Sequence, residues 1–408
     1  MSNYPNNQKK KNLKPIKGIF LEAVSSGVKK FGHLDLLLIT LCDSSIVSAV
    51  FTSNKFYAAP VLIAKKNLLS KKPIRALIIN SGNANAGNGK NGLKNTEIIC
   101  EKLAVILQCD PKQILPFSTG VLFEPLPYKL IINCLPSIVK NLNENNWLKA
   151  AMSVMTTDTF PKVLSRQTRI LEKKVNINGF AKGSGMIKPN MGTMLAFIAF
   201  DAVVKKSILN KMIKHISNLS FNNITVDGDT STNDSFVLIA TGKGELEVNE
   251  INSPEYIYLL DNLTKLSIDL AKMIIYDGEG ATKFITIKVL QAKSIQESKD
   301  VAFKIAHSPL VKTAFFASDP NLGRILSAVG NSNIKNFNFD KVHLYLNNFL
   351  IFKNGERVES YNENLGKKIM KKREIEIKVL LGRGNAESSI WTCDLSDKYV
   401  KINSEYRT

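Results

Sequence analysis

The sequence has few cysteines and histidines, and neither residue type shows the spacing of a metal site. The five cysteines form no CxxC pair and are odd in number, which argues against a disulfide framework; they are Cys42, Cys100, Cys109, Cys134 and Cys393. The four histidines also lack metal-ligand spacing. The sequence therefore predicts no metal ion and favours a reducing, cytoplasmic location.

Long apolar runs are missing too. No window reaches the roughly 18 uninterrupted apolar residues of a membrane helix, because Asp35, Asp43 and Asp201 interrupt the best candidates. The N-terminus carries lysines but neither an apolar signal core nor an arginine-rich amphipathic pattern. We expect a soluble protein in which residues 1–18 form a disordered leader.

Acidic residues are fewer than basic ones: the chain has 35 Asp and Glu and 55 Lys and Arg residues, which give a net charge of +20. Such an excess raises the question of a nucleic-acid or membrane partner. The lysines are scattered, however, and their short clusters are not interleaved with the aromatic residues that stack on bases. We therefore expect neither nucleic acid nor a membrane as a partner.

The chain is long enough, at 408 residues, to bury a large core in two or three domains or in two fused lobes. Apolar patterns predict a pair of strands at residues 34–41 and 45–51, further strands at 60–64, 75–79 and 284–289, and helices at 91–107, 136–142, 147–155, 205–219 and 253–276.

Residues 182–200 join a glycine-rich turn directly to an apolar run. The glycines permit unusual backbone angles and Pro189 fixes its own φ, so we expect a shaped loop. Residues 193–200 lack polar alternation, which fits a strand covered on both faces, although a buried helix has the same pattern. Thr193 stands at the join and could be an ordinary strand-entry residue.

Three polar turns follow strand-like segments. Residues 80–89 are rich in asparagine and glycine, which suits either a floppy surface loop or a ligand site at the end of a strand. Thr119 and Gly120 close a second turn, either as ordinary turn residues or as donors to an oxyanion. Residues 227–235 contain three aspartates but lack the terminal glutamate of an EF-hand, so we predict no metal there.

Three further polar residues each have an ordinary structural interpretation. Thr156 belongs to a threonine cluster that could cap a helix. Lys182 is either a solvated loop lysine or the partner of a substrate carboxylate. Glu279 lies between two glycines and could be a solvated turn residue.

Taken in order, these motifs resemble those of the ornithine acetyltransferase family, also called the glutamate N-acetyltransferase or ArgJ family. The similarity runs from about residue 18 to residue 408. The stretches that carry it are residues 80–89, 116–121, 182–200, 227–235, 277–283, 319–324, 380–386 and 397–408.

The resemblance implies that the precursor cuts itself between Gly192 and Thr193. The products would be an α chain of residues 19–192 and a β chain of residues 193–408, with Thr193 as the nucleophile. By the same resemblance, Thr119 and Gly120 stabilise the oxyanion. The residues implied to contact the substrate are Thr156, Lys182, Thr193, Glu279, Asn403 and Thr408.

The activity implied by the resemblance is acetyl transfer from N2-acetylornithine to glutamate in arginine biosynthesis. Some family members also use acetyl-CoA as a co-substrate, and no cofactor is implied. The implied fold is a two-lobed α/β protein with layered mixed β-sheets flanked by helices (DmpA/ArgJ-like), and the implied assembly is α2β2. The alternative is a self-processing aminopeptidase or amidohydrolase that uses the same kind of nucleophile but passes the acyl group to water.

The sequence departs from the family pattern at five positions. Gly192 replaces the usual alanine before Thr193, Lys188 replaces the alanine of an alanine-proline pair, and Phe123 replaces a glycine. Leu322 stands where a tryptophan is expected, and Asn385 where an acidic residue is expected.

Overall fold

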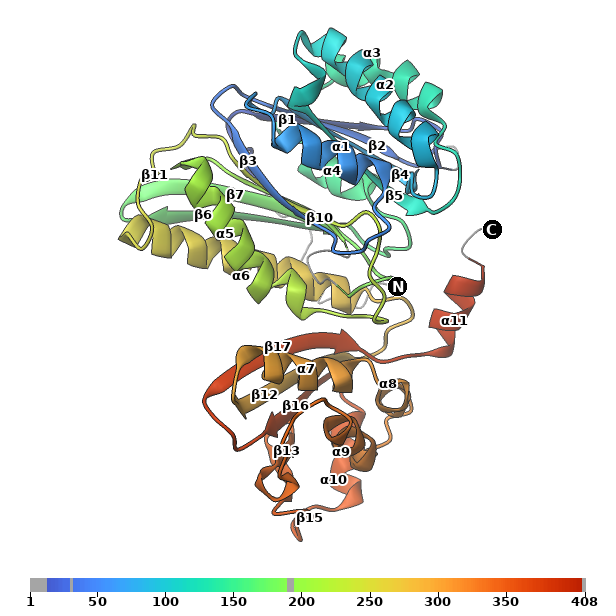
Figure 1. Ribbon diagram of the computed structural model, residues 1–408, viewed down its shortest axis with the longest axis vertical. Coiled ribbons are helices and arrows are strands. Elements are labelled where there is room, and N and C mark those ends of the chain that lie inside the picture. The colour runs from blue at the N-terminus through green and yellow to red at the C-terminus, as the bar shows by residue number, and fades with distance from the viewer. Residues whose placement is uncertain (1–12, 30–31, 189–193, 406–408) are drawn as a thin grey trace. The chain divides into compact units, whose positions relative to one another are not determined.

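The computed structural model describes residues 13–29, 32–188 and 194–405 (Figure 1). The chain forms two compact units: residues 1–222 with 229–274, and residues 223–228 with 275–408. The expected cleavage point after Gly192 falls inside the first unit, so the two expected chains would both contribute to that unit.

The first sheet of the first unit has the strand order β1-β2-β4-β5. Its strands are β1 (Ile19–Val24), β2 (Leu36–Leu41), β4 (Ala76–Asn83) and β5 (Ile114–Val121). Only the β4–β5 pair is parallel. Helices α2 (Gly89–Leu107) and α3 (Tyr128–Lys140) cover one face of this sheet, where their apolar residues form a cluster with Leu36, Leu38 and Ile78.

The second sheet has the order β3-β10-β8-β7-β6. Its strands are β3 (Ile46–Phe51), β6 (Lys162–Ile170), β7 (Lys173–Lys182), β8 (Leu195–Phe200) and β10 (Ser235–Ala240). Every residue of β8 is buried, which confirms the strand predicted from the missing polar alternation. Strand β8 pairs antiparallel with β7 and parallel with β10.

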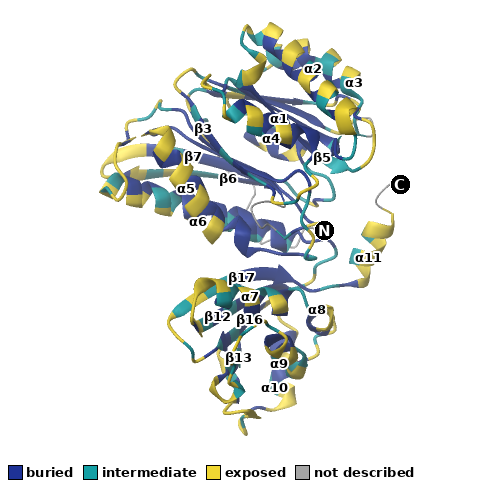
Figure 2. Ribbon diagram, viewed as in Figure 1, coloured by how far each residue is buried: buried dark blue, intermediate teal, exposed yellow. Residues whose placement is uncertain are grey.

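The two sheets face each other across an apolar layer. Phe197 of β8 stacks on Phe180 of β7, with ring centroids 5.1 Å apart, and meets Phe117 of β5 edge-on at 5.2 Å. Helix α4 (Trp147–Ser153) adds Trp147 to the same layer. Figure 2 shows this interior as buried ribbon between outer helices whose outward faces are exposed.

Two helices cover the outer face of the second sheet, as Figure 1 shows. They are α5 (Lys206–Leu219) and α6 (Pro254–Tyr276), and Leu266 and Leu270 of α6 lie over Gly179 of β7. The short elements of this unit are α1 (Ala59–Leu68), β9 (Val203–Val204), β11 (Glu247–Val248) and the 3-10 turns Pro111–Gln113 and Phe221–Asn223.

Two predictions about the first unit were wrong. Residues 60–64 begin helix α1 rather than a strand, because Pro60 occupies the first helical turn, where no backbone N–H donor is needed. Strands β2 and β3 do not pair with each other; β2 pairs with β1 and β4, while β3 pairs with β10 in the other sheet.

The second unit is built on one six-stranded mixed sheet with the order β15-β14-β13-β16-β12-β17. Its strands are β12 (Phe284–Ala292), β13 (His343–Leu346), β14 (Phe349–Lys353), β15 (Glu356–Arg357), β16 (Glu374–Leu380) and β17 (Ala386–Cys393). Its helices are α7 (Ile295–Ala306), α8 (Pro309–Phe316), α9 (Leu322–Gly330), α10 (Glu363–Met370) and α11 (Asp397–Ser404), with a 3-10 turn at Phe339–Lys341.

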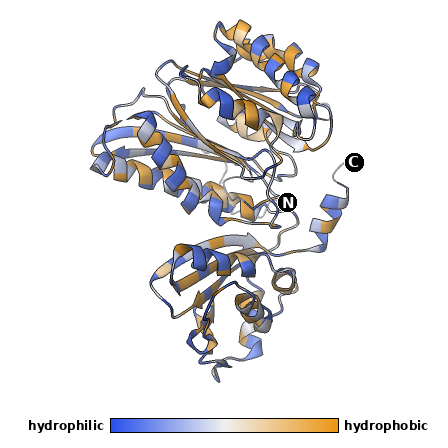
Figure 3. Ribbon diagram, viewed as in Figure 1, coloured by the Kyte–Doolittle hydropathy of each residue, from blue (hydrophilic) through white to orange (hydrophobic). Residues whose placement is uncertain are grey.

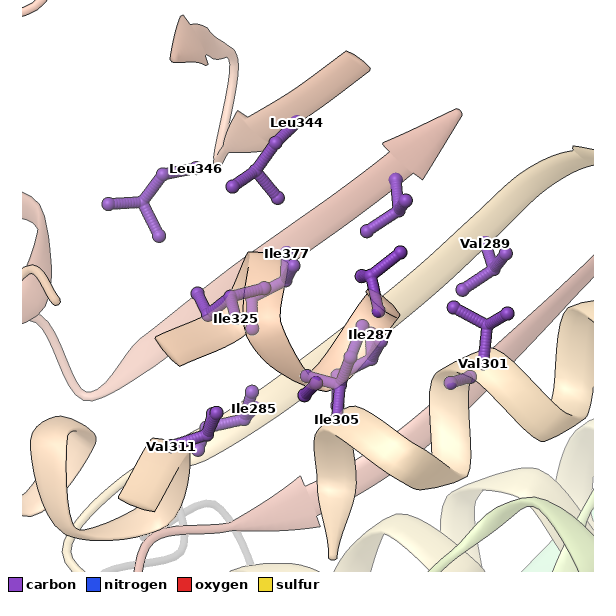
Figure 4. Packing of buried hydrophobic residues seen from close by; sticks show 14 of the residues in the cluster. Ile285, Ile287, Val289, Val301, Ile305, Val311, Ile325, Leu344, Leu346 and Ile377 are labelled. Atoms are coloured by element: carbon purple, nitrogen blue, oxygen red, sulfur yellow. The ribbon is translucent and has the colours of Figure 1, made fainter. Parts of the chain in front are cut away.

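The core of the second unit lies between this sheet and its helices. Figure 4 shows Val301 and Ile305 of α7 beside Val289 and Ile287 of β12, and Ile325 of α9 beside Ile377 of β16. Buried aliphatic side chains of this kind supply most of the free energy that drives a unit of this size to fold.

The layered mixed sheets flanked by helices confirm the predicted α/β fold class. Figure 3 shows hydrophobic stretches along the strands and mixed faces on the covering helices. Among the residues that the structure describes, no helix is both long enough and apolar enough to span a membrane.

Candidate active site

The predicted oxyanion residues, Thr119 and Gly120, lie near the end of β5, beside Ser81 and Gly82 of β4. Gly120 has a φ of +131°, and a Cβ added there would lie 2.3 Å from the carbonyl carbon of Gly82. No side chain fits in that space, so the close approach of the two strands requires glycine at position 120. Thr119 and Gly120 are only half-buried. The strand end therefore presents a hydroxyl and a backbone amide at a fixed place.

The asparagine-rich segment is an ordered part of the site rather than a floppy loop. Its first residues, through Asn83, continue strand β4. The Asn80 side-chain amide donates to the carbonyl of Asn83 at 2.8 Å, and the Asn85 amide donates to the Thr96 hydroxyl at 2.7 Å. Asn80, Asn83 and Asn85 are all buried. The interpretation as a mobile surface loop is wrong, because these side chains hold the backbone in place from within.

Asn233, in the predicted polar turn at residues 227–235, connects this segment to strand β5. Its side-chain amide donates to the carbonyl of Ala84 at 2.6 Å and to the carbonyl of Ser118 at 2.9 Å. Ser118 immediately precedes Thr119. One side chain thus fixes the asparagine-rich segment relative to the strand that carries Thr119 and Gly120.

Two predicted substrate residues, Thr156 and Lys182, contact each other. The Lys182 ammonium donates to the Thr156 hydroxyl at 2.8 Å. Lys182 ends strand β7, and Thr156 follows helix α4. The structure therefore brings together a cation and a hydroxyl that are 26 residues apart in the chain.

Asp158 organises this pair, and sequence reasoning missed it. Its carboxylate accepts from the backbone amides of Thr156 at 2.9 Å and Gly183 at 2.7 Å, and its oxygens lie 2.6 Å from the Lys162 ammonium and 4.0 Å from that of Lys182. The side chains of Asp158 and Lys162 are fully buried. Burial alone would raise the pKa of Asp158, but the two ammonium groups and the Gly183 amide hold it well below its usual range. Asp158 therefore stays ionised and fixes Thr156 relative to Lys182.

A second carboxyl group, that of Asp234, lies beside the residue that follows the expected nucleophile. It accepts hydrogen bonds from the Ser231 hydroxyl and from the backbone amide of Met194. One of its oxygens is buried with no hydrogen-bond partner. Burial raises the pKa of Asp234 well above its usual range, although the hydrogen bonds from Ser231 and the charge of Lys182 act in the opposite direction. Thr193 itself, with Gly192, lies outside the described residues.

In the second unit, Glu279 and Asn403 are brought together. The side-chain amide of Asn403, in α11, donates to Glu279 Oε2 at 2.7 Å. Glu279 is 7% exposed. Ser396, just before α11, donates its hydroxyl to the carbonyl of Gly280 at 2.7 Å and so ties the start of that helix to the Glu279 turn. Thr408 lies outside the described residues.

The positions at which this sequence differs from the family pattern have different structural surroundings. Phe123 has a φ of +63°, a region that favours glycine, so the glycine expected there suits the backbone better. Leu322 begins α9 and packs against the core of the second unit. Asn385 is exposed, and nothing in the structure explains its substitution.

Comparison with known proteins gives a family match and similar relatives. The ArgJ family model matches residues 20–408. Two relatives, both named arginine biosynthesis bifunctional protein ArgJ, come from Neisseria meningitidis (50% identity) and Neisseria gonorrhoeae (49% identity). Each alignment spans 398 residues and covers 97% of this chain and 97% of the relative.

A solved structure gives a further match. The crystal structure of arginine biosynthesis bifunctional protein ArgJ from Bacillus halodurans is 35% identical, with a TM-score of 0.47. The match covers 52% of this chain and 99% of that chain.

Proposed function

Because this chain belongs to the ArgJ family, we propose that it transfers acetyl from N2-acetylornithine to glutamate, releasing ornithine and forming N-acetylglutamate. The observation that carries the proposal is the family match over residues 20–408. The contact between Thr156 and Lys182 supports it, because a hydroxyl beside a cation suits an amino-acid carboxylate.

The proposed nucleophile is Thr193, freed by self-cleavage. Its hydroxyl attacks the Gly192 carbonyl carbon, the peptide bond breaks, and water hydrolyses the resulting ester. The α chain then ends at Gly192 and the β chain begins at Thr193. The new α-amine has a reference pKa of about 7.7 to 8.0, so it can accept the proton of its own hydroxyl near neutral pH.

Transfer then follows in two half-reactions. Thr193 Oγ attacks the acetyl carbonyl of N2-acetylornithine, the amide C–N bond breaks, and the proton passes to the leaving amine of ornithine. The unprotonated α-amine of glutamate next attacks the acetyl ester and regenerates the Thr193 hydroxyl. This order predicts ping-pong kinetics.

Each half-reaction places negative charge on the acetyl oxygen. Thr119 and Gly120 are proposed to stabilise that charge through the Thr119 hydroxyl and the Gly120 amide. This role is supported by the close approach of β5 to β4, where position 120 admits only glycine. Glu279 and Asn403 are proposed to bind the substrate, and a carboxylate at Glu279 suits the side-chain amine of ornithine. Thr408 is proposed to contact substrate as well.

Further properties belong to the same proposal. The α and β chains would stay associated as α2β2 in the cytoplasm, acting on small molecules without a cofactor or a metal ion. Glutamate acetylation from acetyl-CoA would use the same acetyl-Thr193 intermediate, with CoA as the leaving thiol.

The experiment that tests the proposal measures ornithine release from N2-acetylornithine with and without glutamate. A transferase releases ornithine continuously only when glutamate is added, and N-acetylglutamate appears in equal amount. Continuous release without glutamate would instead identify an amidohydrolase that passes the acetyl group to water.

A further inference from the structure

Lys29 belongs to none of the motifs above, yet it reaches the turn that holds Thr156. Its backbone amide donates to Asp35 Oδ2 at 2.9 Å. Asp35 is fully buried, and its carboxylate also accepts from the backbone amides of Ser26 and Gly27. The segment that carries Lys29 is therefore fixed by one buried side chain.

The Lys29 side chain runs from the oxyanion strands to the Thr156 turn. A Cβ added to Gly82 would lie 2.6 Å from Lys29 Cγ, so the lysine's aliphatic stem crosses the backbone of Gly82, which is paired with Gly120. Its ammonium donates to the carbonyl of Met155, the neighbour of Thr156. An ammonium has three N–H donors, so this contact uses one of them.

Lys29 and Lys182 thus bring two ammonium groups to consecutive residues, one to Met155 and one to Thr156. The charged groups that act on Lys29 are Lys182 at the end of β7, Asp158 after α4 and Asp35 before β2. Burial and the neighbouring Lys182 lower the pKa of Lys29 to about 8, although Asp35 and Asp158 act in the opposite direction. The charge of Lys29 is therefore easily changed near neutral pH.

The two substrates of the proposed reaction place different demands on such a pair. N2-acetylornithine has one carboxylate and a cationic side chain, whereas glutamate has two carboxylates. One cation serves the carboxylate that both share, and glutamate needs a second cation that acetylornithine does not. We propose that Lys29 binds the carboxylate that glutamate has and acetylornithine lacks, so that it determines specificity for the acetyl acceptor.

This inference rests on the proposed function and gives the lowered pKa of Lys29 a physical role. A glutamate carboxylate raises the pKa of Lys29 and draws a proton to it. Acetylornithine has no second carboxylate, and its side-chain amine is proposed to bind Glu279, so it places no demand on Lys29. The pKa of Lys29 is then raised only in the half-reaction that uses glutamate.

The test compares Lys29→Met with the wild-type enzyme in both half-reactions. The KM for glutamate should rise about tenfold or more relative to any change in the KM for N2-acetylornithine, as expected when a hydrogen bond between charged groups is lost. Lys66→Met is the matched control, because Lys66 is an exposed lysine of α1 that faces Glu97 at 3.8 Å. Equal effects of Lys29→Met on the two KM values, or no effect on either, would overturn the inference.

The pH dependence of the KM for glutamate is a second test, and it does not require Lys29→Met to fold correctly. In the wild type, the glutamate KM should carry a component that rises above about pH 8, where Lys29 loses its proton. Lys29→Arg keeps its charge at all these pH values and should lose that component. An unchanged alkaline rise in Lys29→Arg contradicts the assignment. Failure of the proposed function looks different, since the wild type would then show no glutamate-dependent transfer at all.

Discussion

At the scale of single residues, the buried Asp158–Lys162 pair holds the Thr156 turn against the end of β7. Both charges are removed from water, and each depends on the other together with the backbone amide of Gly183. Removing one partner of such a pair leaves the other charge buried without its counter-ion.

Replacing Asp158 by Asn should destabilise the protein by about 3 kcal/mol or more at neutral pH, measured by denaturant unfolding. The pKa of Asp158 is lowered in the folded protein, so its stabilisation is complete above the unfolded value of about 3.9 and is lost as pH falls through the folded value. The difference between wild type and Asp158→Asn should therefore be constant from about pH 5 to 7 and shrink in stronger acid.

The control is Asp261→Asn, which removes an exposed i,i+4 pair with Lys265 and should change stability by less than about 1 kcal/mol. Equal stability of Asp158→Asn and the wild type at pH 7 would show that Asp158 does not hold the turn.

The residues found from the sequence and those missed differ for a physical reason. Lys182 and Thr156 stand in motifs that resemble the family, so both could be named before the structure. Lys29 lies 126 residues from Met155 in the chain. A contact over that separation cannot be recognised from the spacing of neighbouring residues in the sequence. Asp158 stood within the same threonine cluster as Thr156, but nothing local indicates which of these side chains is buried.

At the scale of elements, Asn233 connects three segments around the site: the turn before β10, the loop after β4 and strand β5. Each of its two donated bonds ends on a backbone carbonyl, so the side chain sets backbone positions rather than side-chain positions. The positions of Thr119 and Gly120, the proposed oxyanion donors, therefore depend on Asn233.

Replacing Asn233 by Asp removes both N–H donors and sets a carboxyl oxygen against two carbonyl oxygens. We expect kcat to fall by about a hundredfold, because misplacing catalytic groups by about 1 Å costs that much, with a smaller change in KM. Asn262→Asp is the control, since Asn262 donates one exposed bond within α6. A kcat equal to that of the wild type would mean that β5 holds its position without Asn233.

Elements with one clear pattern could be predicted, whereas those decided by tertiary contacts could not. Strand β8 and helices α5 and α6 agree with their predicted ranges within about two residues at each end. The strand prediction for residues 60–64 was wrong because a short apolar run containing proline fits a strand or a first helical turn equally well. The predicted pairing of β2 with β3 was wrong because strands that are neighbours in sequence were assumed to pair.

At the scale of the whole molecule, self-cleavage after Gly192 would cut the chain without separating its products. Strand β7 would belong to the α chain and β8 to the β chain, yet they pair along their length, from Ile177 with Phe200 to Lys182 with Leu195. The apolar layer between the sheets also combines Phe117 and Phe180 with Phe197.

The two chains should therefore co-elute in native size-exclusion chromatography and separate only in denaturant. The eluted mass distinguishes one α and one β chain from the α2β2 assembly that the proposed function includes. Separation of the chains in native buffer would contradict the pairing of β7 with β8.

The most direct test of the central claim is the intact mass of the β chain after incubation with N2-acetylornithine alone. We expect a chain that begins at Thr193, gains the mass of one acetyl group and loses it when glutamate is added, with N-acetylglutamate as the product. Thr193→Ala should remain uncut and unacetylated. Acetyl transfer to glutamate by an uncut chain, or by Thr193→Ala, would show that Thr193 is not the nucleophile.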